Sequence, residues 1–325
     1  MRDIHRACLA LSLLLGTAPL AVSSDEVTAE RLGQHYDNIY RIDFARDGRS
    51  MVTASGDNTA VIWDYPTVEE RYLLEHVGPV YAAVFSPDQR YVATGSGDGA
   101  VTLWSTKDGQ RVQQVQEHGD AVYSVAFSPD GTLLASAGGN GGGGDTICRI
   151  WNAANLKVIA ELRGHTRPVY GVDFSPDGQT LATSSRDHTV RLWSLADHTY
   201  RELTEHRSDV YRCRFSPDGR WLATASQDAT VRIWSVDGTT PEARFSGYRH
   251  PVYAAVFSQN GQWLAAVGDD FRLRIWRVGT WELVLDQQMT QRALYAVEFA
   301  PGGRQIILGG EDTLLYRVNL PQQAD

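Results

Sequence analysis

The chain has 325 residues, 42% of them hydrophobic, so it is long enough to bury a sizeable core. Lysine and arginine total 30 against 39 aspartates and glutamates, which gives a formal net charge of -9. This acidic balance, without a cluster of basic residues, argues against a nucleic-acid-binding surface, because such a surface needs positive charge opposite the phosphates.

The N-terminal segment, residues 1–23, has the layout of a secretory signal peptide. Arg2 and Arg6 flank a charged start, an apolar run follows over residues 7–15, and Ala21 and Ser23 suit a cleavage site. The apolar run is too short to span a bilayer as a mature helix, and no long apolar run follows it. We therefore predict cleavage and export, to the periplasm or outside the cell, with no membrane span in the mature chain. A retained N-terminal anchor is the alternative.

The rest of the chain repeats one unit seven times. The opening position of the unit is held by His35, His76, His118, His165, His206, Tyr248 and Thr290. Successive spacings are 41, 42, 47, 41, 42 and 42 residues, and the long one coincides with the glycine-rich insertion Gly138–Gly144. A period of about 40–45 residues is that of a propeller blade.

Each unit also has the local pattern of a small antiparallel sheet. Short runs alternate apolar and polar residues, as strands do, and Ser-Pro-Asp-Gly stretches predict turns between them. Six units end in a tryptophan, which is followed by aspartate in Trp63-Asp64. These features resemble the WD40-repeat β-propeller family, in the manner of an exported bacterial-type member. The resemblance implies an all-β, seven-bladed propeller that holds partners.

The seventh unit is one strand short, because the chain ends soon after residues 314–318. The segment at the start of the mature chain resembles residues 157–163, the outer strand before His165. We predict that residues 25–34 form the outer strand of the last blade, completing residues 290–320 and leaving no open sheet edge. Residues 24–325 would then be a single domain, which we expect to be a monomer.

Five units carry a polar set that resembles a catalytic triad: histidine, serine or threonine, aspartate, then tryptophan. The sets are His35/Thr53/Asp57/Trp63, His76/Thr94/Asp98/Trp104, His118/Ser136/Asp145/Trp151, His165/Thr183/Asp187/Trp193 and His206/Thr224/Asp228/Trp234. In the family that the chain resembles, such a set is a buried hydrogen-bond network within one blade, and five copies favour that architectural role over catalysis. We predict no catalytic residue and no enzyme activity. In the seventh unit, Arg317 or Val318 takes the tryptophan position.

The sequence contains no motif for a metal, phosphate or other cofactor, so none is predicted. Cys148 and Cys213 occupy apolar positions in different units, which favours reduced core cysteines over a disulfide and argues against a metal site. The Gly138–Gly144 run is interpreted as a flexible loop. A mobile lid over a binding site is the alternative.

Every unit holds a tyrosine four residues before a phenylalanine or its equivalent: Tyr40, Tyr81, Tyr123, Tyr170, Tyr211, Tyr253 and Tyr295. The resemblance implies that this position starts the innermost strand, at the mouth of the central channel, on the top face where WD-repeat proteins commonly hold partners. The sixth and seventh units have lost the histidine but kept the tyrosine, while the residue after the tyrosine varies freely. This contrast favours a binding role, with simple packing across the channel mouth as the alternative.

Residues before the aspartate turns would flank the tyrosines. They are Arg186, Gln227, Asp269 and Glu311 in the last four blades. The first three blades have Gly56, Gly97 and Gly144 there and so present no side chain at this position. Tyrosine suits protein interfaces and cations, so we predict a non-enzymatic interaction scaffold of the cell envelope whose partner presents arginine or lysine. The alternatives are a propeller that binds or senses a small cationic or aromatic ligand, and a structural component of an envelope assembly with a broad apolar patch on its sides.

Overall fold

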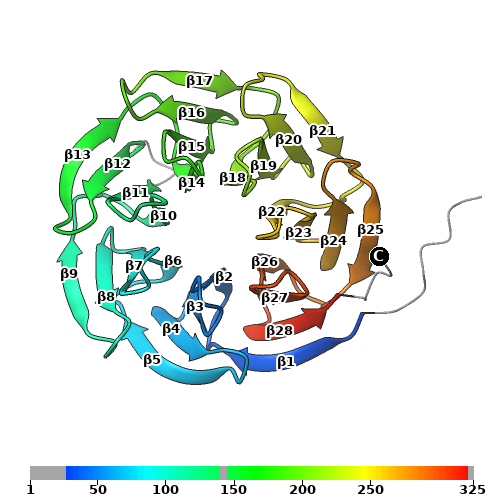
Figure 1. The fold of residues 1–325 in the computed structure, drawn as a ribbon, viewed down its shortest axis with the longest axis horizontal. Coiled ribbons are helices and arrows are strands. Elements are labelled where there is room, and N and C mark those ends of the chain that lie inside the picture. The colour runs from blue at the N-terminus through cyan, green and yellow to red at the C-terminus, as the bar shows by residue number, and fades with distance from the viewer. Residues whose placement is uncertain (1–26, 140–144, 321–325) are drawn as a thin grey trace, which may run out of the picture.

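A computed structural model describes residues 27–139 and 145–320 of the chain. Within these residues there are twenty-eight strands and no helix, and the strands form seven four-stranded antiparallel sheets set around one axis (Figure 1). The predicted all-β, seven-bladed propeller is therefore confirmed. The predicted signal peptide, residues 1–23, lies outside the described residues, as does most of the Gly138–Gly144 loop.

Each blade is a meander whose first strand lies nearest the axis and whose last strand lies at the rim (Figure 1). Blades 1 to 3 contain β2 (Ile39–Phe44), β3 (Ser50–Ser55), β4 (Thr59–Asp64), β5 (Glu69–Glu75); β6 (Val80–Phe85), β7 (Tyr91–Ser96), β8 (Val101–Ser105), β9 (Arg111–Val115); and β10 (Val122–Phe127), β11 (Leu133–Gly138), β12 (Cys148–Asn152), β13 (Lys157–Leu162). Blades 4 to 6 contain β14 (Val169–Phe174), β15 (Thr180–Ser185), β16 (Val190–Ser194), β17 (Tyr200–Leu203); β18 (Val210–Phe215), β19 (Trp221–Ser226), β20 (Val231–Ser235), β21 (Pro241–Phe245); and β22 (Val252–Phe257), β23 (Trp263–Gly268), β24 (Arg272–Arg277), β25 (Leu283–Gln288). Blade 7 contains β26 (Leu294–Phe299), β27 (Gln305–Gly310), β28 (Leu314–Asn319) and, from the other end of the chain, β1 (Ala29–Gln34).

The ring closes through blade 7, as the sequence predicted. Strand β1 pairs antiparallel with β28, from Ala29 opposite Val318 to Gln34 opposite Leu314. Val318 also pairs with Ile306 of β27 in the register that places tryptophan in the other blades, so Val318, and not Arg317, takes that position. With β1 in place, β28 is paired on both sides and blade 7 matches the other six.

The hydrophobic core lies between adjacent blades. Ile42 of blade 1, for example, packs in one cluster with Ala296 and Ile307 of blade 7. Cys148 and Cys213 are buried, unpaired and members of two different clusters, which confirms the prediction of reduced core cysteines. Packing of each sheet against the next therefore holds the innermost strands in place around the axis.

Four of the five polar sets form the buried network expected of them. In blade 4, His165 bonds through Nδ1 to Asp187 at 2.8 Å and through Nε2 to Thr183 at 2.7 Å, and Trp193 donates to the same threonine at 2.9 Å. The sets that begin at His35, His118 and His206 repeat this geometry. The sets thus satisfy their own buried polar atoms and tie the strands of each blade together.

The prediction was wrong for the second set, which does not close. The His76 ring is partly buried, and its Nε2 has no hydrogen-bond partner among the described residues. In blades 1, 4 and 5 a threonine two residues after the aspartate donates to its carboxylate, at 2.5–2.7 Å. Blade 2 has Ala100 there, and Ser96 donates to Asp98 instead, so the carboxylate is held away from the histidine.

Blade 6 replaces the network with a cation–π contact. Tyr248 occupies the histidine position and is buried, and the guanidinium carbon of Arg274 lies 4.1 Å from the centre of its ring. Arg274 is held in turn by Asp270 at 2.6 Å. A pair of this kind compensates part of the hydrogen bonding that the missing histidine would supply.

Candidate binding site

A β-bulge repeated in all seven innermost strands positions the tyrosines. The pairing with the second strand of each blade shifts by one residue at the tyrosine. In blade 4, Val169 pairs with Ser185 and Gly171 with Ser184, which leaves Tyr170 as the extra residue. A bulge interrupts the alternation of faces and re-aims the local side chains, so the tyrosine and the residue after it can both face the axis.

The seven tyrosines form a closed ring. The centres of neighbouring side-chain rings are 4.9–5.7 Å apart at every step, with tilted or edge-on contacts that suit aromatic pairs. Seven groups at that spacing lie about 6 Å from the axis, so a single side chain can pass between them but a helix of about 10–12 Å diameter cannot. All seven side chains are half-buried, and the ring is therefore open to solvent.

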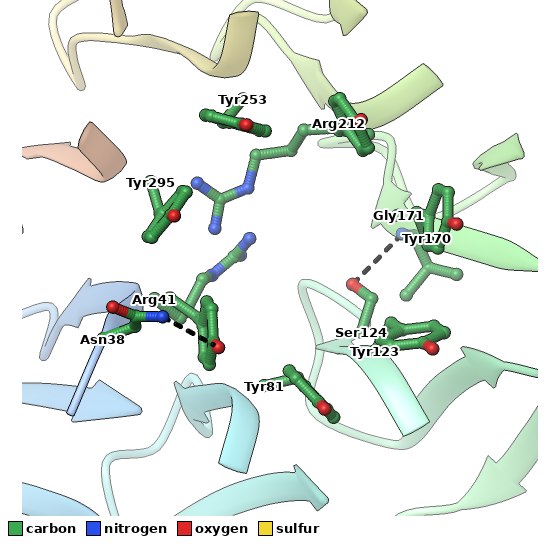
Figure 2. A pocket seen from close by; sticks show the side chains of 13 residues that line it. Asn38, Arg41, Tyr81, Tyr123, Ser124, Tyr170, Gly171, Arg212, Tyr253 and Tyr295 are labelled. Carbon is green, nitrogen blue, oxygen red and sulfur yellow. Dashed lines mark hydrogen bonds between the residues drawn. The ribbon is translucent and has the colours of Figure 1, made fainter. Parts of the chain in front are cut away.

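The tyrosine ring surrounds a cavity of about 290 Å³. Besides the seven tyrosines, the cavity is lined by Asn38, Arg41, Ser124, Gly171, Val172 and Arg212 (Figure 2). The tyrosines thus pack against one another, as the packing alternative requires, and still leave a space comparable to the smallest ligand pockets, of about 300 Å³. The ring does not fill the channel mouth.

Arg41 and Arg212 are the functional candidates that the sequence interpretation missed. They come from blades 1 and 5, and Figure 2 shows both guanidinium groups pointing toward the middle of the tyrosine ring. Only 4% of Arg41 and 8% of Arg212 is exposed. Both directly follow a ring tyrosine, at the position that is small in the other five blades: Ala82, Ser124, Gly171, Ala254 and Ala296. Those small residues leave room for the two long side chains.

The two arginines are poorly compensated. Nε and Nη2 of Arg41 are buried without a hydrogen-bond partner, and neither guanidinium forms an ion pair with a carboxylate of the described residues. Burial, reinforced by the positive charge of Arg214, lowers the pKa of Arg41 to about 10. Burial and the charges of Arg41 and Arg214 also lower the pKa of Arg212. Positive charge in this cavity is therefore destabilised in the absence of an anion.

The carboxylates of the channel lie one layer further along the same strands and are engaged there. Arg214 pairs with Asp173 at 3.0 Å and with Glu298 at 3.4 Å. Asp43 accepts the backbone N–H of Phe85 at 2.8 Å. The lower layer thus satisfies most of its own charges, whereas the upper pair, Arg41 and Arg212, has no ion-pair partner in the part of the chain that the structure describes.

The predicted flanking residues do gather around the ring. Arg186, Gln227, Asp269 and Glu311 each donate a backbone N–H, at 2.9 Å, to the carbonyl two residues before a ring tyrosine. Gly56 and Gly97 make the same bond in blades 1 and 2. In blade 3 the bond comes from Gly139, which corrects the assignment of this position to Gly144; Gly144 itself lies outside the described residues.

The charges on this rim are already paired. Asp269 lies 3.8 Å from His250, Glu311 lies 3.4 Å from Arg292, and Arg186 lies 3.6 Å from Asp209. Exposed pairs of this kind contribute little stability, and His250 is a cation only when it is protonated. The acidic side predicted for blades 6 and 7 is therefore neutralised at Glu311 by Arg292, while two arginines line the interior of the cavity.

Seven four-stranded blades, repeated His–Thr–Asp–Trp networks and a side-chain-lined axial cavity define a propeller of the WD-repeat class. The chain belongs to the WD40 β-propeller family: a family model described as the IFT122 first beta-propeller matches residues 79–320, and one described as WD domain, G-beta repeat, matches residues 27–64. A comparison with curated proteins finds no match. The fold fits a protein-interaction scaffold in general.

Residues 27–139 and 145–320 contain no helix that is long and apolar enough to cross a membrane. The same residues contain no group of three or more histidine, cysteine, aspartate or glutamate side chains placed to hold a metal ion.

Proposed function

We propose that this protein is a non-enzymatic scaffold of the cell envelope that binds a polypeptide partner on the face ringed by tyrosines. The observation that carries the proposal is the closed ring of seven half-buried tyrosines around an open cavity. Tyrosine offers a large apolar face and a polar tip at little entropic cost, which is why it is common at interfaces. Because the opening admits a side chain but not a helix, the partner would present a loop or a chain end.

The envelope location rests on the sequence alone. The charged start, apolar run and small residues of positions 1–23 support export, to the periplasm or outside the cell. We retain a monomer as the expected state. The arginine or lysine predicted on the partner is not retained in this proposal, because Glu311 is paired with Arg292 and two arginines face the cavity.

The two alternative functions, binding a small ligand and serving as a structural component of an envelope assembly, would use different parts of the protein surface. A small cationic ligand would fit the cavity volume but would meet two arginines there. A structural component would dock through its sides, where exposed apolar residues lie on the outer strands of five blades around the ring (Figure 1): Leu73, Val112, Val158, Ile159, Tyr200 and Leu283.

A capture experiment with two matched triple variants separates these possibilities. The mature protein is cross-linked in the native envelope fraction as wild type, as Tyr170→Ala/Tyr211→Ala/Tyr253→Ala, and with Val112, Ile159 and Leu283 changed to alanine. The proposal requires that one partner is lost from the tyrosine variant and kept by the outer-strand variant, with both variants melting cooperatively. Loss from the outer-strand variant alone would instead favour docking through the blade sides.

A further inference from the structure

Two buried arginines with unused hydrogen-bonding capacity face a cavity that only a side chain or chain end can enter. We propose that Arg41 and Arg212 bind a carboxylate that a partner polypeptide inserts through the tyrosine ring. The inference rests on the proposed function, since it names the chemical group by which the partner is held.

The donor atoms of Arg41 suit a carboxylate. Its unpartnered nitrogens, Nε and Nη2, lie on one edge of the planar guanidinium, where two parallel N–H groups match the two oxygens of a carboxylate. This edge is buried, so the side chain would turn it toward the cavity when the carboxylate binds. Arg212 enters the same cavity from blade 5, so an anion between the two side chains would receive donors from both sides (Figure 2). A bond shared by two guanidinium groups also fixes the direction from which the carboxylate enters.

The charge balance limits the entering group to a single negative charge, because the three arginines of the two layers are matched in number by three acids beneath the cavity. Among the described residues, the upper layer holds two cations without ion pairs, and the layer beneath contains Asp43, Asp173 and Glu298 with one cation, Arg214. A monoanion would relieve the repulsion between the upper arginines. A dianion such as phosphate would add a second negative charge above three acidic groups, which disfavours it.

The ring tyrosines also suit the entry of a carboxylate, because they are neutral and offer both apolar faces and hydroxyl groups. Burial, with the charges of neighbouring tyrosines and acids, raises the pKa of Tyr295 to about 12 and also raises the pKa values of Tyr211 and Tyr253. These phenols therefore stay neutral at physiological pH and add no negative charge at the entrance. Their faces can pack on the aliphatic part of an incoming aspartate, glutamate or C-terminal residue, and their hydroxyl groups can donate hydrogen bonds.

The test begins with peptides selected on the mature protein. Two libraries of random linear heptapeptides are displayed, one with a free C-terminus and one with both ends blocked. We expect the selected peptides to share an aspartate or glutamate, or to come from the free-C-terminus library alone. A selected peptide is then resynthesised with the carboxylate replaced by the corresponding amide.

The peptide pair is titrated against wild type, Arg41→Gln/Arg212→Gln, the triple tyrosine variant and a control, Arg90→Gln, which removes an exposed arginine. The amide should bind wild type and the control about tenfold or more weakly than the acid, and the two peptides should bind the double arginine variant equally. Equal binding of acid and amide to wild type, with binding still lost from the tyrosine variant, would overturn this inference and leave the proposed function standing. Peptides that bind the tyrosine variant as well as wild type would overturn the proposed function itself.

Two free anions then identify the source of the charge. Butyrate, a monocarboxylate, should displace the peptide from wild type only at concentrations far above that of the peptide, because it lacks the contacts to the tyrosine faces. Butyrate as effective as the peptide would support the carboxylate but overturn its polypeptide source. Inorganic phosphate that displaces the peptide at a lower concentration than butyrate would overturn the carboxylate.

Discussion

Replacing Arg41 or Arg214 with methionine should change the free energy of unfolding in opposite directions, although both arginines lie near the propeller axis. Arg41 is buried, and its pKa falls from 12.5 to about 10 on folding. At about 1.4 kcal/mol per pH unit, keeping this side chain charged in the folded state costs on the order of 3 kcal/mol. Because the folded pKa is the lower one, the cost is complete at every pH below 10, including pH 7.

Arg41→Met keeps the aliphatic stem and removes the charge. We expect the free energy of unfolding of the unliganded protein to rise by about 1–3 kcal/mol, the lower end applying if the shorter side chain leaves part of the cavity unfilled. Arg214→Met is the matched control, because this arginine is paired with Asp173 and Glu298. Its loss leaves two largely buried carboxylates without a cation, which should lower the free energy of unfolding by about 3 kcal/mol.

Equilibrium unfolding in guanidinium chloride measures both changes, and tryptophan fluorescence is a suitable probe because blades 1 to 6 each hold a buried tryptophan. The slope of the transition should be unchanged, so that a shift of the midpoint reports stability alone. A fall in stability of more than about 1 kcal/mol for Arg41→Met would refute the reasoning. It would mean that the carboxylates beneath Arg41 already compensate its charge, and the cavity would then have no need of an anion.

Three further predictions concern the fold. Deleting residues 27–34 removes β1 and opens the edge of β28, so the melting temperature should fall by about 10 °C or more, and an unchanged melt would contradict ring closure. Burial holds the pKa of His76 at about 4, below its ordinary 6.5, so its contribution to stability is complete above pH 6.5 and is lost as the pH falls toward 4. His76→Gln should therefore reduce the loss of unfolding free energy in acid over that window by about 3 kcal/mol, and a pH profile equal to that of wild type would count against this. Burial raises the pKa of the Cys213 thiol to about 12, so iodoacetamide at pH 8 should modify Cys148 and Cys213 only after unfolding; fast reaction in the native state would show that the blades open locally.

The architecture could be predicted from the sequence because the same sequence pattern recurs in every blade. Seven units with one period, one turn chemistry and a tryptophan near the end leave little choice of fold, and the missing last strand has a matching segment at the start of the mature chain. What the pattern left open was register. The choice between Arg317 and Val318 required the observed pairing of β27 with β28, since two adjacent residues differ only in which face of the strand they occupy.

The tyrosines of the site were predicted, but Arg41 and Arg212 were interpreted as free variation. A signal for them was present in the first unit. Its buried apolar residues are Ile39, Ile42 and Phe44, a step of three followed by a step of two. A strand without a bulge keeps steps of two, so the longer step indicates a bulge that turns both Tyr40 and Arg41 toward the axis. Arg214 is paired with Asp173 and Glu298, and these three residues come from three strands that are distant in the sequence. No local sequence pattern could therefore predict that these acids pair with Arg214 and leave Arg41 and Arg212 without ion pairs.

The failure at His76 shows the limit of reading function or structure from residue types alone. Blade 2 has the same histidine, threonine, aspartate and tryptophan as blade 1, yet its carboxylate turns toward Ser96. The difference lies outside the set: blade 2 has Ala100 in place of the threonine that bonds the aspartate in blade 1, and Thr102 in place of Arg149, which bonds it in blade 3. Neighbouring side chains compete for hydrogen bonds to the aspartate carboxylate, so the orientation of the carboxylate depends on which of these neighbours is present.

A ring of seven equivalent tyrosines is symmetric, and symmetry limits what it can recognise. It offers any entering side chain seven nearly identical walls, and so by itself it cannot orient a partner on the face of the propeller. Arg41 and Arg212 break that symmetry, since only blades 1 and 5 carry a cation in this layer while the other five carry a small residue. The positions at which the repeats agree therefore build the entrance, and the positions at which they differ supply charge and direction. In a repeat protein of this kind, the candidate binding residues are best sought where one copy departs from the others at a position that faces the shared axis.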